Sequence, residues 1–83
     1  KGYSVKVGKL NDLEIDFIAT KNEERVYIQV AYLLASPETI EREFGVLEKI
    51  QDNFPKYVIS VDMFDMSRNG IKHFNIIDFL LDK

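Results

Sequence analysis

Two segments near the start of the chain alternate apolar and polar residues. SVKVGKL, residues 4–10, predicts a strand that ends near Gly8. LEIDFIAT, residues 13–20, is apolar at its odd-numbered positions and polar at its even-numbered positions, with Ile18 as the exception. A turn at residues 11–12 separates the two segments. We therefore expect the first two strands of an antiparallel meander.

A third strand is expected from VYIQVAYLLA, residues 26–35, because such a nearly continuous apolar run is typical of a strand buried on both faces. The preceding KNEE, residues 21–24, predicts a turn. If that turn is centred between Asn22 and Glu23, paired residues have numbers that add up to 45. The most apolar sides of both strands then share one face, and a slip by one residue would break this agreement.

This register brings polar side chains together on the other face. Asp16 is expected to face Gln29, and Glu14 to face Ala31. Because a buried amide needs a hydrogen-bond partner, we expect Gln29 to form a hydrogen bond across the strand pair.

A helix is expected to begin at Ser36 and Pro37, since serine caps free amide groups and proline suits the first helical position. Pro55 is expected to end it. Gly45 within the helix predicts close packing on a neighbour, and the charged residues 41–43 predict a solvated helix face. The expected buried stripe consists of Ile40, Phe44, Leu47, Ile50 and Phe54.

The second half of the chain adds two strands. YVISV, residues 57–61, is uniformly apolar, and the intervening helix makes it parallel to the third strand. Asn69 and Gly70 predict a turn before a last strand within IKHFNI, residues 71–76, and residues 76–83 predict a short closing helix. The expected fold is α+β with a mixed sheet of about five strands. Since one long helix covers only one face, either the terminal segment covers the other face or a missing helix or a partner does, and we favour the latter. Self-association of the chain through this face is also expected.

Composition limits the function classes. The chain has 83 residues, which we assign to a single domain, residues 1–83, and it begins with Lys1 rather than methionine, which favours a fragment of a longer protein. With no cysteine, disulfides and thiolate metal sites are excluded. The apolar runs are too short to span a membrane, so a cytoplasmic location is expected. A net charge of −3 with scattered basic residues disfavours nucleic acid as the partner.

Residues 2–34, 36–62 and 67–81 resemble the C-terminal domain of unknown function that follows the ATPase module in predicted prokaryotic AAA+ ATPases. The meander, helix and strand also resemble the core of the PD-(D/E)XK restriction-endonuclease-like fold. That resemblance implies an aspartate on the second strand and a Glu/Gln-x-Lys motif on the third, with two carboxylates holding Mg²⁺ and a lysine orienting the nucleophile. Asp16 matches the aspartate, and Gln29 begins the matching motif. The family's N-terminal helix, which carries a glutamate, would precede Gly2.

The chain departs from this pattern at two positions. Gln29 is a neutral amide in place of an anionic metal ligand, and Ala31 replaces the lysine. Asp16 with Glu14 leaves a weak Mg²⁺ site as a hypothesis, and no cofactor is expected.

Two functions follow as hypotheses, beside a third hypothesis of a free-standing small structural domain. The first is a non-catalytic recognition or assembly module that contacts the rest of a parent ATPase or another protein. The second is a Mg²⁺-dependent nuclease whose lysine has migrated to Lys6, Lys9 or Lys21. His73, the single histidine, is expected to be structural.

Overall fold

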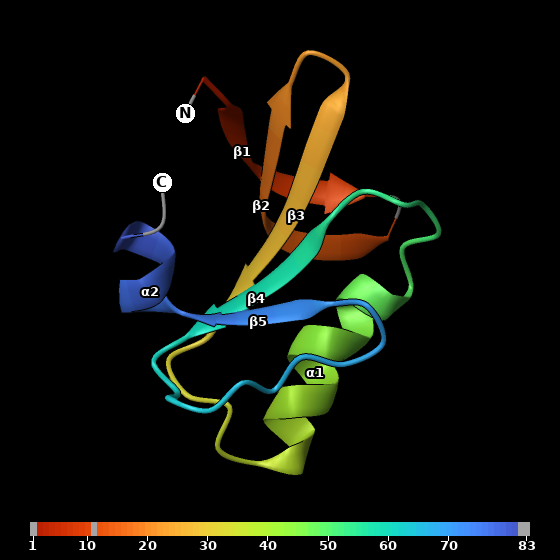
Figure 1. Ribbon diagram of the computed structural model, residues 1–83. Helices are drawn as coiled ribbons and strands as arrows, with labels where there is room; N and C mark the ends of the chain where they lie inside the picture. The colour runs from red at the N-terminus through yellow and green to blue at the C-terminus, as the bar shows by residue number, and fades with distance from the viewer. Residues whose placement is uncertain (1, 11, 82–83) are drawn as a thin grey trace.

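Five strands form one mixed sheet in the computed structural model, which describes residues 2–10 and 12–81. The strands are β1 (Ser4–Leu10), β2 (Leu13–Lys21), β3 (Glu24–Val30), β4 (Lys56–Ser60) and β5 (Lys72–Asn75), and the helices are α1 (Pro37–Glu48) and α2 (Ile76–Leu81). The strands lie side by side in chain order, antiparallel from β1 to β3 and parallel from β3 to β5 (Figure 1). The expected α+β domain with a mixed five-stranded sheet is confirmed.

Helix α1 begins as the sequence predicts. The Ser36 hydroxyl accepts a hydrogen bond from the Thr39 N–H at 3.2 Å, and Pro37 occupies the first turn. These contacts satisfy amide groups that have no partner inside the helix.

The helix ends earlier than expected, at Glu48 rather than next to Pro55. The Asp52 side chain accepts the Phe54 N–H at 3.0 Å, and the Lys56 ammonium donates to the backbone oxygens of Asp52 and Phe54. Side-chain bonds of this kind stabilise a turn in competition with helix, because they satisfy backbone groups that helix would otherwise pair.

The expectation of close packing at Gly45 is wrong. A Cβ atom built on Gly45 has no neighbour within 4 Å, so this glycine lies in open space. Its hydrogen side chain therefore does not serve a close contact.

The main core lies between α1 and the sheet. Tyr27 on β3, Phe44 and Leu47 on α1, and Val58 on β4 have no exposed surface. Their cluster is completed by Ile15, Leu34, Ile50 and Ile71. Burial of this apolar area provides the principal driving force for folding.

The loop between β4 and β5 crosses α1 and is tied to it. Arg68 forms ion pairs with Glu41 at 2.9 Å and with Glu48 at 2.8 Å. The expected turn follows directly, with Asn69 at φ 52° and Gly70 at φ 80°, in the left-handed region that asparagine and glycine tolerate. Figure 1 shows this loop passing over the helix.

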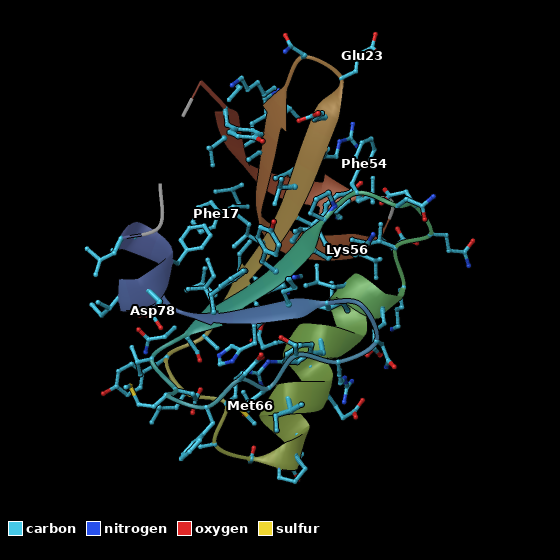
Figure 2. All side chains as sticks on the ribbon, in the orientation of Figure 1. Phe17, Glu23, Phe54, Lys56, Met66 and Asp78 are labelled. Atoms are coloured by element: carbon cyan, nitrogen blue, oxygen red, sulfur yellow. The ribbon has the colours of Figure 1, made fainter. Side chains whose placement is uncertain are left out.

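The opposite face of the sheet is covered at one end only. Phe79 of α2 packs on Tyr57 and Phe74, with ring centroids 6.4 and 5.9 Å away. The remainder of that face, which we call the open apolar face, exposes several side chains, and Figure 2 shows the Phe17 ring projecting toward the side on which α2 lies. The open apolar face consists of Val5, Val7, Phe17 and Val30. The terminal helix thus covers part of the face for which the sequence predicts additional cover.

Candidate functional site: the Asp16–Gln29 junction

The predicted register of β2 and β3 is confirmed. Phe17 pairs with Ile28 and Lys21 pairs with Glu24, so paired numbers add up to 45 along the ladder. Asn22 adopts φ 57° in the tight turn that joins the strands.

A bulge interrupts β2 where it passes β1. Ile18 pairs with Lys6 and Ile15 pairs with Gly8, so two residues of β2, Asp16 and Phe17, lie opposite one residue of β1. A bulge leaves a residue outside the regular ladder and reverses the alternation beyond it. Ile15 and Ile18 therefore both contribute to the core on the α1 side, although an odd number of steps separates them.

At this bulge Asp16 and Gln29 bond reciprocally to backbone groups. The Asp16 N–H donates to Oε1 of Gln29 at 2.6 Å, and the Val30 N–H donates to Oδ2 of Asp16 at 2.8 Å. Gln29 is only 4% exposed. The buried amide thus satisfies an N–H group that the bulge removes from the ladder, and the carboxylate satisfies another.

The other expected pair is not formed. The β2–β3 ladder ends at Phe17 and Ile28, and Glu14 pairs instead with Lys9 of β1. The Ala31 N–H donates to Ile59 O at 2.9 Å. The expectation that Glu14 faces Ala31 is therefore wrong.

Glu43 of α1 is a site residue that the sequence prediction missed. It is 9% exposed, so the expected solvated face is wrong at this position. Burial raises the pKa of Glu43, and the nearby Asp16 carboxylate raises it further, while the ion pair with Arg42 at 3.3 Å acts in the opposite direction. The signal was its spacing: Glu43 lies three residues after Ile40 and four before Leu47, on the buried stripe.

The junction therefore contains two carboxylates and one amide. Within residues 2–10 and 12–81, no group of three or more histidine, cysteine, aspartate or glutamate residues is arranged to hold a metal ion. The candidate lysines lie elsewhere in the ladders: Lys6 opposite Ile18, Lys9 opposite Glu14, and Lys21 opposite Glu24.

A second polar network surrounds His73, which is 6% exposed. Its Nδ1 accepts the Met66 N–H at 3.1 Å, so the proton of the neutral ring is assigned to Nε2, which contacts the Ser60 hydroxyl at 2.7 Å. The Ser60 hydroxyl donates to Asp62 at 2.6 Å, and the Leu34 N–H donates to the same carboxylate oxygen. The serine therefore lies between the histidine and the acid. In a nucleophilic triad the histidine lies between the serine and the acid, so this network has a different order.

Comparisons with known proteins give one informative match. The chain is 40% identical to an uncharacterized protein of Haemophilus influenzae over 82 residues, which are 98% of this chain and 20% of that protein. The chain thus spans about a fifth of the length of this relative. No protein-family model matches the chain, and no solved structure matches it. In the described part of the chain, no helix is long and apolar enough to cross a membrane.

Proposed function

We propose that this chain is a non-catalytic, restriction-endonuclease-like module that acts in recognition or assembly within a longer ATPase. The observation that carries the proposal is the reciprocal bonding of Asp16 and Gln29. These side chains occupy the positions that the nuclease resemblance assigns to metal chemistry, and here they bond to backbone N–H groups of the strand pair. One carboxylate oxygen of Asp16 is thereby engaged in joining the two strands.

Two further features support the assembly role. The open apolar face offers Val5, Val7, Phe17 and Val30 to a protein partner, since contiguous exposed apolar side chains mark protein interaction sites. The relative in Haemophilus influenzae is about five times as long as the matched segment, so a related segment occurs within a larger polypeptide there.

The competing function is the Mg²⁺-dependent nuclease. It is favoured by one observation, the proximity of the buried Glu43 to Asp16, which supplies a second carboxylate in place of Gln29. Paired carboxylates are the usual protein ligands of Mg²⁺.

A magnesium titration separates the two functions. Amide resonances of Glu14, Asp16, Gln29 and Glu43 are followed while MgCl₂ is raised into the millimolar range. If the chain is a non-catalytic module, these resonances do not move, and supercoiled plasmid remains intact in a parallel cleavage assay. Saturable shifts at Asp16 and Glu43 that Glu43→Gln abolishes, together with nicking of the plasmid, would establish the nuclease instead.

The assembly role has its own test. The chain and the remainder of its parent protein are produced as separate polypeptides, and their binding is measured by calorimetry. Phe17→Lys and Val30→Lys are expected to weaken binding by at least about tenfold, because each places a charge in an apolar contact. Met63→Lys is the matched control, since Met63 is 83% exposed and lies in the β4–β5 loop. Equal binding by all three variants would contradict the proposed face.

A further inference from the structure

Strand β1 forms a free edge of the sheet. It is the first strand in the order, and its only strand neighbour in the described chain is β2. Lys21 and Glu24 flank a two-residue turn and form a hydrogen-bonded pair, and hydrogen-bonded and non-hydrogen-bonded pairs alternate along β2 and β3 from that point. Ile18 and Thr20 of β2 therefore direct their backbone groups toward β1, where they lie opposite Lys6 and Ser4. Ser4 and Lys6 consequently direct their backbone groups toward β2. Val5 and Val7 direct their N–H and C=O groups outward, where a further strand would pair with them.

The two sides of this edge differ in chemistry. Val5 pairs with Ala19 on the open apolar face, and the side chains of Val5 and Val7 are 58% and 83% exposed. Lys6 pairs with Ile18 on the α1 side, where its side chain is also exposed. A pairing strand would therefore meet apolar side chains on one side and a cation on the other.

A groove lies beside this cation on the α1 side. It has a volume of about 370 Å³ and is bordered by Lys6, Gly8, Thr20 and Arg25. Helix α1 contacts β2, β3 and β4 but not β1, so the groove is left uncovered. Gly8 is required at this place, because the Ile18 side chain occupies the position that a Cβ atom would take.

The charges along β1 disfavour a second copy of the chain as the occupant. Lys6 and Lys9 are the charged residues of β1, and neither forms an ion pair within the described part of the chain. Lysines on an edge strand repel an identical strand, because antiparallel pairing brings like charges close together. The same lysines attract carboxylates, although the chain as a whole carries a net charge of −3.

From these observations we propose that β1 binds an extended acidic segment of another protein as a sixth strand. Apolar side chains of that segment contact Val5 and Val7, and the alternate side chains, which are carboxylates, point toward Lys6 and the groove that Arg25 borders. Backbone pairing supplies affinity and the alternation supplies specificity. The proposal is independent of the nuclease-like resemblance, because it uses neither Asp16 nor Gln29.

The test uses an acetylated, amidated peptide of about eight residues that alternates valine and glutamate, a typical strand length. Its binding is followed by amide shifts and by hydrogen exchange in the 83-residue chain. The Val5 and Val7 amides are expected to shift and to exchange more slowly once paired. Lys6→Glu is expected to weaken binding by at least about fivefold, as one exposed attraction becomes a repulsion, and Lys6→Gln by less. Lys72→Glu on β5, the opposite edge, is the matched control and leaves the affinity unchanged.

Other results would overturn the proposal. A valine–lysine peptide that binds as well as the valine–glutamate peptide would show that charge does not select the occupant. Shifts centred on Phe17 and Val30, with the Val5 and Val7 amides unmoved, would place the peptide across the sheet face and not along the β1 edge. Val5 and Val7 amides that are already protected without peptide, together with a dimeric mass in sedimentation, would make a second copy the occupant.

Discussion

The parallel and antiparallel halves of the sheet differ in how completely they are covered. In the parallel half, α1 covers one face and α2 the other, and Tyr27, Val58 and Ile59 are at most 2% exposed. In the antiparallel half, Val5 and Val7 of β1 are largely exposed, and α1 does not contact the strand. We therefore expect stability to reside chiefly in the parallel half, whereas β1, which neither helix contacts, lies in the antiparallel half.

The largest expected effect tests this division directly. Phe44→Ala removes a fully buried ring between α1 and the sheet, and we expect it to lower the free energy of unfolding by about 3–5 kcal/mol. Val7→Ala on the free edge should change it by no more than about 0.5 kcal/mol. Urea unfolding of both variants provides the measurement. Similar losses for the two would show that the halves contribute equally.

The second-largest loss of stability is expected at the boundary between the halves, where Asp16 and Gln29 lie. Gln29→Leu leaves the partly buried Asp16 N–H without its acceptor, and we expect this to lower the free energy of unfolding by about 1–3 kcal/mol. Glu14→Gln, a change at an exposed residue of the same strand, is the control and should be nearly neutral. If Gln29→Leu unfolds at the same urea concentration as the original chain, the reciprocal bonds do not stabilise the junction.

The sequence predicts this boundary well in one respect and poorly in another. The β2–β3 register follows from a short turn and a period of two, both local features. Ile18 is the exception to the alternation in β2, and the structure explains it, because the bulge at Asp16 and Phe17 returns Ile18 to the α1 side. A bulge depends on the neighbouring strand, so the pattern of one strand shows only that something is irregular.

The early end of α1 and the burial of Glu43 were missed for related reasons. The apolar stripe continues past Glu48 to Ile50 and Phe54, but bonds from Asp52 and Lys56 select a turn there. Glu43 stands in a charged run, and composition favours solvent for such a run, while its helical spacing places it against the sheet. The end of the helix is decided by side-chain bonds within residues 52–56, and the burial of Glu43 by the packing of α1 on the sheet.

Glycine substitutions compare the halves again, with effects of opposite sign. Gly45→Ala should raise the free energy of unfolding by up to about 1 kcal/mol, because alanine favours helix and the position is open. Gly8→Ala on β1 should lower it by about 1–3 kcal/mol, since the new Cβ would fall on the Ile18 side chain. Thermal unfolding of the two variants measures these opposite signs. A stabilising Gly8→Ala would mean that Ile18 moves aside without cost.

The smallest expected effects are those of pH, and the two polar networks should respond with opposite signs. The Ser60 hydroxyl lowers the pKa of Asp62, assisted by the Leu34 N–H, against an opposing effect of burial. An acid with a lowered pKa stabilises the fold above its ordinary value, and this contribution is lost as pH falls through the folded value. Burial raises the pKa of Glu43, so its contribution is present below the ordinary value of glutamate and is lost as pH rises through the folded value.

Urea midpoints between about pH 3 and pH 7 should therefore separate Asp62→Asn from Glu43→Gln. Asp62→Asn is expected to be less stable than the original chain at neutral pH and to approach it in acid. Glu43→Gln is expected to match the original chain in acid and to gain on it as pH rises, because the amide has no charge to desolvate. Parallel pH profiles for the two variants would contradict these assignments. Opposite profiles would mean that the Asp62 carboxylate near His73 stabilises the fold through its charge, whereas the Glu43 carboxylate beside Asp16 is tolerated at a cost.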